Sequence, residues 1–358
     1  MKRILVYALT CRRGGIESFF LNYSNRLSNV QLDFIKFTPN ELSFENELKK
    51  GRIFYLPRTK ENIILRKRKI KEIFDKNKYD ALWFNSNDLA SVDIIKEAHQ
   101  RGVKCIIHAH NSKANGFSRI LRHKINRKID ENLFDVKFAC SESAAKWFFP
   151  NCDDVSLIYN AINVDKYFFN HSSRRKIRGK FGISEESIVL GDIGRLEKQK
   201  NFGYLIDVFA KYHQKKSNSY LMIVGEGSLK KELSEHANQL GISDFVLFVG
   251  EVNNVEDYLS AFDIFAMPSL YEGLPVTLVE AQASGLQCLV SNTVTDEVNV
   301  TGNISYYPID EEDIDKWVNN IKISGDRLAN GKKVKKTVFD ISISAAELES
   351  KILEVINK

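Results

Sequence analysis

Two series of short apolar runs, separated by segments with helical spacing, extend along this chain of 358 residues. The runs of the first series lie at 4–8, 81–84 and 104–108. Those of the second lie at 188–193, 220–224, 245–249, 264–266 and 287–290. Strands that alternate with helices form parallel sheets covered by helices on both faces. The sequence therefore predicts an α/β protein with two Rossmann-like domains, whose ligand sites lie in a central crevice at the carboxyl ends of the strands.

The boundary between the two domains is predicted in a turn-rich segment, Asn160–Asp165, which follows a strand-like run at 155–159. We predict a first domain over 1–165 and a second over 166–341. Apolar residues at positions 343, 348, 352, 353 and 356 predict an amphipathic closing helix over about 342–358.

Composition and cysteine usage indicate a soluble protein of a reducing compartment. Apolar residues make up 43% and charged residues 27% of the chain, and no apolar run approaches the ~18 residues of a membrane span. The first residues lack the apolar region and cleavage site of a signal peptide. Five scattered cysteines form no Cys-x-x-Cys pair: Cys11, Cys105, Cys140, Cys152 and Cys288. This pattern argues against a disulfide framework and a thiolate metal site, so we expect a cytoplasmic protein.

Basic residues concentrate in the first half of the chain. Residues 1–165 hold 29 Lys and Arg against 19 Asp and Glu, net +10, whereas residues 166–358 hold 23 against 27, net −4. Two dense basic patches lie at 63–71 and 117–128. In the second, helical spacing groups Ile120, Leu121, Lys124, Ile125 and Lys128. Such a stripe can lie on an anionic membrane, and a solvated helix packed by its apolar side is the alternative. No nucleic-acid-binding module accompanies the charge, so nucleic acid is not an expected partner.

Glu272 and Glu280 stand on either side of a predicted helix start. Turn residues up to Gly273 follow an apolar run, and Pro275 suits the first helical turn because its fixed φ fits there. Glu272 then lies on the loop, and Glu280 lies about two turns into the helix. The helix dipole and three free N–H groups favour an anion in front of the helix, at Leu274, Val276 and Thr277. Carboxylates beside such amides fit a nucleotide sugar, and plain compensation of the dipole is the alternative.

Glycine-containing loops follow three of the predicted strands. Gly14-Gly15 lets backbone approach a phosphate, but the turn is shorter than G-x-G-x-x-G, and a tight βα turn explains it equally well. After the strand that opens the second domain, Arg195 and Lys200 converge, and two cations can neutralise a departing diphosphate without a metal. Solvated loop charge is the alternative. Gly225-Glu-Gly227 is a third loop of this kind and is a weak signal by itself.

Two further patterns resemble metal-binding motifs. His108 and His110 share a strand face, but no third ligand lies at motif spacing. We therefore expect one histidine to contact substrate and the other to pack. Asp313-Ile-Asp315 spells the D-x-D with which metal-dependent transferases hold a nucleotide sugar, yet capping of the following helix explains it. We predict no metal site.

With these residues assembled, the chain resembles the retaining GT-B glycosyltransferases often called family four, and most closely their bacterial exopolysaccharide and capsule branch. The resemblance is nearly full length and rests on motifs in the family's order. They are Gly14-Gly-Ile-Glu17, His108-Ala-His-Asn111, 138–142, 158–163, Gly194-Arg-Leu196 with Gln199-Lys-Asn201, and 268–275 through 280–285.

The resemblance implies roles for individual residues. Arg195 and Lys200 hold the donor diphosphate, Glu280 accepts from the ribose hydroxyls, and Glu272 contacts hydroxyls of the transferred sugar. His110 approaches the donor sugar near the reacting centre. Backbone at six positions binds the donor: Gly14, Gly15, Gly273, Leu274, Val276 and Thr277. The closing helix is expected to cross back to the first domain.

The resemblance also implies a mechanism. The family retains the anomeric configuration without a metal, and the acceptor hydroxyl attacks the face that the nucleotide leaves. The departing phosphate takes the proton of that hydroxyl. Glu272 then stabilises charge and orients the sugar, and it is not a nucleophile.

These implications give one leading hypothesis and two alternatives. In the first, the protein works at the inner face of the cell membrane and extends a polyprenyl-diphosphate-linked glycan. It uses a hexose or N-acetylhexosamine from a UDP donor and needs no cofactor beyond that nucleotide sugar. A sugar-nucleotide 2-epimerase of the same fold is the second hypothesis, and a non-catalytic GT-B partner protein is the third. The pair Glu272 and Glu280 favours the transferase, and the retained charged residues argue against the partner protein.

Overall fold

The computed structural model describes residues 1–10, 14–48, 51–86, 88–110, 117–130, 133–150, 154–323 and 325–357. Cys11 and Cys152 of the predicted reduced cysteines lie outside this part of the chain, as does Asn111 of the histidine motif. The chain divides into two compact units. Unit 1 comprises residues 1–161 with 341–358, and unit 2 comprises residues 162–340. The units are described one at a time below.

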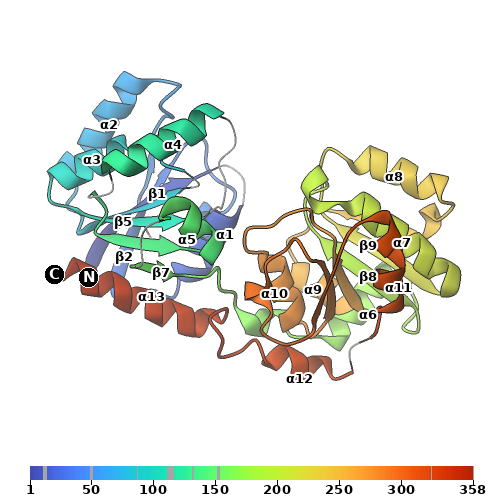
Figure 1. The fold of residues 1–358 in the computed structure, drawn as a ribbon. Coiled ribbons are helices and arrows are strands. Elements are labelled where there is room, and N and C mark those ends of the chain that lie inside the picture. Colours follow the sequence, from blue (N-terminus) through green and yellow to red (C-terminus); the bar gives the residue numbers. More distant parts are fainter. Residues whose placement is uncertain are drawn as a thin grey trace. The chain divides into compact units, whose positions relative to one another are not determined.

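Unit 1 is built on a parallel sheet with strand order β3-β2-β1-β4-β5-β6-β7 (Figure 1). Its strands are β1 (Lys2–Leu9), β2 (Val30–Lys36), β3 (Ile53–Tyr55), β4 (Ala81–Ser86), β5 (Lys104–Ala109), β6 (Val136–Ala139) and β7 (Val155–Leu157). Alternate residues of β1 point to opposite faces, as a strand requires. Leu5 and Tyr7 join the core under α2 (Ile63–Lys76), α3 (Asp93–Gln100) and α5 (Glu142–Phe148). Ile4 and Val6 join the core under α1 (Gly15–Tyr23) and α13 (Ile341–Ile356).

Unit 2 repeats this architecture with strand order β10-β9-β8-β11-β12-β13 (Figure 1). Its strands are β8 (Ile188–Ile193), β9 (Ser219–Val224), β10 (Val246–Gly250), β11 (Ile264–Met267), β12 (Gln287–Ser291) and β13 (Ile304–Tyr307). Leu190 of β8 packs toward α7 (Phe202–Lys215), α8 (Lys230–Gln239) and α11 (Ile314–Asn319). The remaining helices pack against one another and are α6 (His171–Lys180), α9 (Val255–Ala261), α10 (Val276–Ala283) and α12 (Arg327–Lys332).

The unit boundary lies four residues before the predicted one. Ile162 pairs with Asp340 in an isolated bridge, and its N–H donates to the carbonyl of Phe339. These contacts hold the start of the segment 162–167 within unit 2. The last helix begins at Ile341, so it and its buried residues belong to unit 1.

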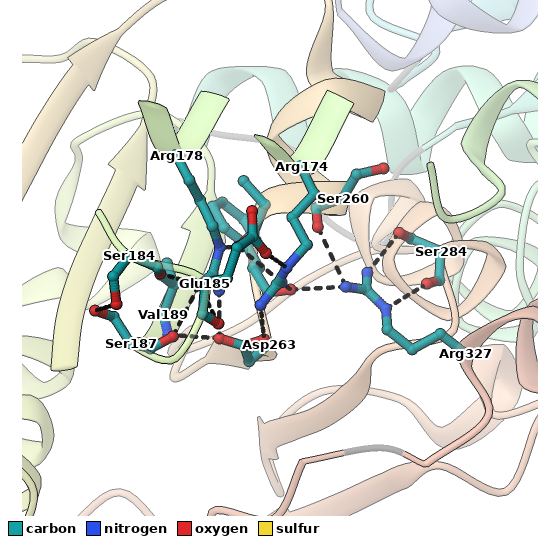
Figure 2. A network of polar contacts seen from close by, with 12 residues as sticks. Arg174, Arg178, Ser184, Glu185, Ser187, Val189, Ser260, Asp263, Ser284 and Arg327 are labelled. Atoms are coloured by element: carbon teal, nitrogen blue, oxygen red, sulfur yellow. Dashed lines mark hydrogen bonds and ion pairs between the residues drawn. The ribbon is translucent and has the colours of Figure 1, made fainter. Parts of the chain in front are cut away.

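Three arginines tie the amino end of β11 to the helices around it (Figure 2). Arg174 and Arg178 both pair with Asp263, which directly precedes β11. The guanidinium of Arg327 is buried and donates to backbone carbonyls, those of Leu259, Ser260, Phe262 and Ser284. Carbonyls at the end of α9 lack helical partners, and cations suit that end of the dipole. The network therefore fixes the amino end of β11.

Candidate functional site

The candidate site of unit 2 lies where the strand order reverses. β8 and β11 are neighbours in the sheet, and the chain leaves their carboxyl ends in opposite directions. In open parallel sheets, ligands bind at this switch point. The loop after β8 contains η4 (Lys198–Lys200), and the loop after β11 contains Glu272. The two loops are joined because Leu270 N–H donates to the Gln199 carbonyl at 2.8 Å, and Gln199 Nε2 donates to the Tyr271 carbonyl at 2.8 Å.

Lys200 and Glu272 form an ion pair across these loops. Lys200 Nζ lies 2.7 Å from Glu272 Oε1, and the two side chains are 15% and 10% exposed. The stem of Lys200 crosses the backbone of Gly194, where an added Cβ would lie 2.8 Å from Lys200 Cε. Glycine at that position therefore leaves room for Lys200 to reach Glu272. The sequence placed both residues at the site but did not predict that they pair.

Arg195 was predicted to act together with Lys200. Its side chain is exposed at the end of β8, and within the described ranges it has no hydrogen-bond or ion-pair partner. Arg195 is thus a free cation on the loop that carries the paired Lys200. Their joint contact with a diphosphate stays a prediction.

Asp192 lies beneath this pair and was missed by the sequence reasoning. Its side chain is fully buried, Oδ1 accepts from the Ile193 N–H at 2.7 Å, and Oδ2 is enclosed without a partner in the described structure. Burial raises the pKa of Asp192 to about 7; Lys200 and the Ile193 N–H oppose this rise and Glu272 adds to it. An aspartate in the otherwise apolar run Ile188–Ile193 was the signal available in the sequence.

The helix after Glu272 begins later than predicted. Pro275 has ψ 93°, outside the helical range, and is the N-cap of α10, which starts at Val276. The Leu278 N–H already donates to the Pro275 carbonyl. Pro275 therefore precedes the first turn instead of lying in it. The backbone N–H groups predicted to face an anion have no partner within the described part of the chain, and they are those of Leu274, Val276 and Thr277.

Glu280 occupies the fifth position of α10, little more than one turn into the helix and not two. Its Oε1 accepts a hydrogen bond of 2.8 Å from the Tyr167 hydroxyl. Tyr167 ends η3 (Val164–Tyr167) at the start of unit 2. This partner was not predicted, and it orients the Glu280 carboxylate. Contact of Glu280 with ribose and of Gly273 with the donor stay predictions.

The loop Gly225-Glu-Gly227 has a packing role. Gly225 has φ +137°, and a Cβ there would lie 2.0 Å from the Gly194 carbonyl oxygen. A Cβ at Gly227 would lie 2.4 Å from the Leu196 carbonyl oxygen. The two glycines therefore allow the loop after β9 to pack backbone to backbone against the loop after β8.

In unit 1 the glycine loop after β1 is organised by a buried glutamate. Gly14 is the N-cap of α1, which starts at Gly15. Glu17 Oε1 accepts from the N–H and the hydroxyl of Thr10, each at 2.8 Å, and Oε2 accepts from the Gly14 N–H at 3.0 Å. One carboxylate thus joins the end of β1 to the start of α1. From the sequence, Glu17 was named only as part of the motif Gly14-Gly-Ile-Glu17, and no role was predicted for it.

The two histidines of unit 1 occupy different environments. His108 is fully buried against Phe19 and Trp83 and is the packed one. His110 Nε2 lies 3.0 Å from Asn85 Oδ1, and burial lowers the pKa of His110 to about 3. Because the Asn85 amide nitrogen donates to two backbone carbonyls, its Oδ1 accepts. His110 is therefore neutral and donates from Nε2, while its Nδ1 is buried without a partner in the described structure.

The aspartates of the D-x-D sequence are engaged by lysines. Asp313 occupies the N-cap position of α11, but its side chain makes no capping hydrogen bond and pairs with Lys316. Asp315 pairs with Lys211 at 2.6 Å. The prediction of capping was therefore wrong in detail, because ion pairing provides the partners. Among the described residues, no group of three or more His, Cys, Asp or Glu side chains could hold a metal ion.

The second basic patch forms α4 (Phe117–Asp130), which presents apolar side chains to solvent. His123 is buried, accepts from the Leu89 N–H and stacks on Trp147. The stripe Phe117, Leu121 and Ile125 recurs every four residues and is 83%, 48% and 46% exposed. The helix thus packs through His123, and the alternative that its apolar stripe faces inward is wrong for Leu121 and Ile125. No helix within the described ranges is long and apolar enough to cross a membrane.

Comparisons with known proteins find glycosyltransferases. Residues 173–323 match the family model for glycosyl transferases group 1. The chain is 28% identical to EpsF of Bacillus subtilis strain 168, assigned as a glycosyltransferase, over 99% of this chain and 96% of that one. It is 27% identical to the UDP-Gal:α-D-GlcNAc-diphosphoundecaprenol α-1,3-galactosyltransferase of Escherichia coli, over 78% and 76% of the two chains.

The fold has close counterparts among solved structures. HepE of Anabaena, crystallised with UDP and glucose, superposes with a TM-score of 0.76 at 16% identity over 100% of both chains. At this identity the similarity shows the fold alone. The two parallel-sheet units, whose strand orders agree apart from the additional edge strand β7 of unit 1, are those of the GT-B fold.

Proposed function

We propose that this chain with the GT-B fold is a group 1 glycosyltransferase, and we propose the following reaction for it. It moves a hexose or N-acetylhexosamine from a UDP-sugar to a hydroxyl of a lipid-linked glycan in bacterial exopolysaccharide or capsule synthesis. The anomeric configuration is retained, and no metal or additional cofactor takes part.

One observation carries this proposal: the ion pair of Lys200 and Glu272 at the switch point of unit 2, directly before the N-terminus of α10. A cation and a carboxylate side by side match a ligand that carries a diphosphate and sugar hydroxyls. Lys200, Arg195 and the N–H groups of α10 would bind the phosphates. Glu272 would accept from hydroxyls of the sugar, and Glu280, oriented by Tyr167, from the ribose.

Two comparisons support UDP as the nucleotide. HepE was crystallised with UDP and glucose, and the similar Escherichia coli enzyme is named for a UDP-Gal donor. Negative charge developing on the leaving UDP would be met by Lys200, Arg195 and the helix end. His110 of unit 1, neutral because burial lowers its pKa to about 3, would approach the donor sugar near the reacting centre.

The proposed acceptor is a glycan on a polyprenyl diphosphate, at an anionic membrane surface. The Escherichia coli relative acts on a diphosphoundecaprenol-linked sugar. The exposed stripe of α4 is flanked by Lys124 and Lys128, so it suits the interface of a bilayer with anionic headgroups. On this proposal the enzyme works at the inner face of the cell membrane, where nucleotide sugars and the lipid carrier meet.

Donor binding is tested by calorimetric titration of UDP, GDP and ADP in EDTA. We expect micromolar binding of UDP, weaker binding of the other two, and loss of UDP binding in Lys200→Ala. Lys211→Ala is the matched control, because Lys211 also forms an ion pair in unit 2 but lies on α7 and is exposed. Equal binding by wild type and Lys200→Ala would refute the assigned site.

Transfer is tested with UDP-sugars and a synthetic undecaprenyl-diphosphate-linked sugar. Glu272→Ala should abolish transfer and leave the fold intact, with a lowered thermal midpoint because Lys200 loses its partner. Normal turnover by this variant would overturn the role of Glu272. Release of a free, epimerised sugar without acceptor would instead identify a 2-epimerase.

Membrane association is tested by sedimentation with vesicles that contain phosphatidylglycerol. Leu121→Glu with Ile125→Glu should release the protein from the vesicles. Ile323→Glu is the matched control, because Ile323 is equally exposed but belongs to unit 2. Equal sedimentation of the double variant and wild type would exclude α4 as the contact.

A further inference from the structure

Asp192 is a buried carboxylate that the proposed reaction does not use. It lies next to last in β8, where it is fully buried and where Oδ2 has no partner within the described part of the chain. A buried ionised carboxylate that lacks partners is costly unless a cation or a proton compensates it. The charged groups around Asp192 therefore determine whether its carboxylate binds a proton.

The geometry of β8 places Asp192 directly below the ion pair of the site. Residues two apart on a strand share a face, so Asp192 and Gly194 point to the same side of the sheet as Leu190 and α7. Lys200 crosses that side over Gly194 before it reaches Glu272. The charged groups that act on Asp192 are Lys200 of η4 and Glu272 of the loop after β11.

One more titratable group interacts with Asp192 from β12, which lies beyond β11 in the sheet. On β12 the thiol of Cys288 is buried, and its pKa is raised by burial and by Asp192. β9 places an apolar residue, Ile223, opposite Asp192. The site therefore holds one ammonium that pairs with a loop carboxylate and acts electrostatically on a buried carboxylate.

We propose that Asp192 is a positioning residue that acts through Lys200 and takes up a proton when a nucleoside diphosphate binds there. In the free site the Lys200 charge is shared between Glu272 and Asp192. A diphosphate draws the ammonium toward itself and adds negative charge above Asp192. A proton from solvent then binds Asp192 Oδ2, which restores the charge balance, and no other bond forms or breaks.

This inference rests on the proposed function, because it needs a diphosphate at Lys200. It predicts pH-dependent affinity. The pKa of Asp192 is about 7 in the free protein and would be higher in the complex, so UDP binding should weaken about fivefold between pH 7 and pH 9. Asp192→Asn mimics the neutral acid, so its UDP affinity should be constant over this range.

The direct test is calorimetric titration of UDP at pH 8.0 in two buffers with different ionisation enthalpies. At this pH the terminal phosphate of UDP is already ionised, since its pKa lies near 6, so protons are taken up by the protein. Wild type should take up about 0.4 proton per UDP. Asp192→Asn should take up none, and the surface variant Asp315→Asn should behave like wild type.

The outcomes separate the two proposals. Absence of binding by UDP, GDP and ADP to the wild type would overturn the proposed function and this inference together. UDP binding with no proton uptake by the wild type at pH 8.0 would overturn only the role of Asp192, and this arm needs no variant. Equal uptake by wild type and Asp192→Asn would also refute it. Uptake lost in Asp192→Asn, with flat affinity from pH 7 to pH 9, is the supporting result.

Discussion

The substitution Asp192→Asn should change how the stability of unit 2 depends on pH. An unfolded aspartate has a pKa of about 3.9, whereas burial raises the pKa of Asp192 to about 7 in the fold. Between these values the folded state binds more protons than the unfolded state. Stability contributed by Asp192 is therefore lost as pH rises through this window, and it no longer changes above about pH 7. Asparagine does not titrate and removes the effect.

The size of the effect follows from the two pKa values. Between pH 5 and pH 8, ionisation of one such carboxyl lowers the free energy of unfolding by about 3 kcal/mol, an upper limit because local relaxation reduces it. At pH 5 the wild type should equal or exceed the variant in stability, since the new amide nitrogen is buried where Oδ2 lacks a partner. At pH 8 the variant should have gained about 2–3 kcal/mol relative to wild type.

Urea denaturation followed by tryptophan fluorescence measures this difference. Trp317 is buried in unit 2, and the remaining tryptophans, Trp83 and Trp147, belong to unit 1. A background with Trp83→Phe and Trp147→Phe therefore reports on unit 2. Asp315→Asn is the control, because Lys211 lowers the pKa of this exposed carboxyl and its ionisation is complete above pH 5. A stability difference between Asp192→Asn and its parent that is constant from pH 5 to pH 8 would refute the reasoning.

Three other substitutions test the framework of the site. Arg327→Met removes the donors to four backbone carbonyls and should lower the free energy of unfolding of unit 2 by about 3–5 kcal/mol. Urea unfolding followed by Trp317 fluorescence measures this loss. A loss below about 1 kcal/mol would contradict the prediction. Gly194→Ala places a Cβ 2.8 Å from Lys200 Cε, so UDP affinity should fall about tenfold with an unchanged thermal midpoint. Unchanged affinity would show that Lys200 adapts freely. Glu17→Ala leaves three donors of the glycine loop unpaired and should cost unit 1 about 1–3 kcal/mol, seen in urea unfolding followed at Trp83.

The strands of unit 2 could be predicted because their residues are apolar in short continuous runs. The runs at 188–193, 220–224 and 287–290 agree with β8, β9 and β12 within one residue. β2 was not predicted, because Asp33 interrupts its apolar pattern. That carboxylate is buried and accepts from Arg3, Arg52 and Tyr79, so distant partners compensate what the local pattern excludes.

The candidate site was predicted as a set of residues and not as a set of contacts. Lys200 and Glu272 are 72 positions apart, and only the adjacency of β8 and β11 brings them together. The spacing of Glu272 and Glu280 indicated a pair, but the structure gives them different partners, Lys200 and Tyr167. Sequence spacing indicates which residues lie on the same helix or strand. The order of the strands in the sheet decides which loops, and therefore which side chains, meet.

The Lys200–Glu272 pair has a consequence for which ligands the site accepts. Removing one partner of a mostly buried ion pair leaves the other charge without compensation, which costs more than the pair contributes. A free phosphate that binds Lys200 leaves the Glu272 carboxylate without its cation. A free sugar that binds Glu272 leaves the Lys200 ammonium without its acceptor. A nucleotide sugar satisfies both groups at once. We therefore expect the pair to favour the proposed intact donor over either of its parts, because the two side chains neutralise each other in the free protein.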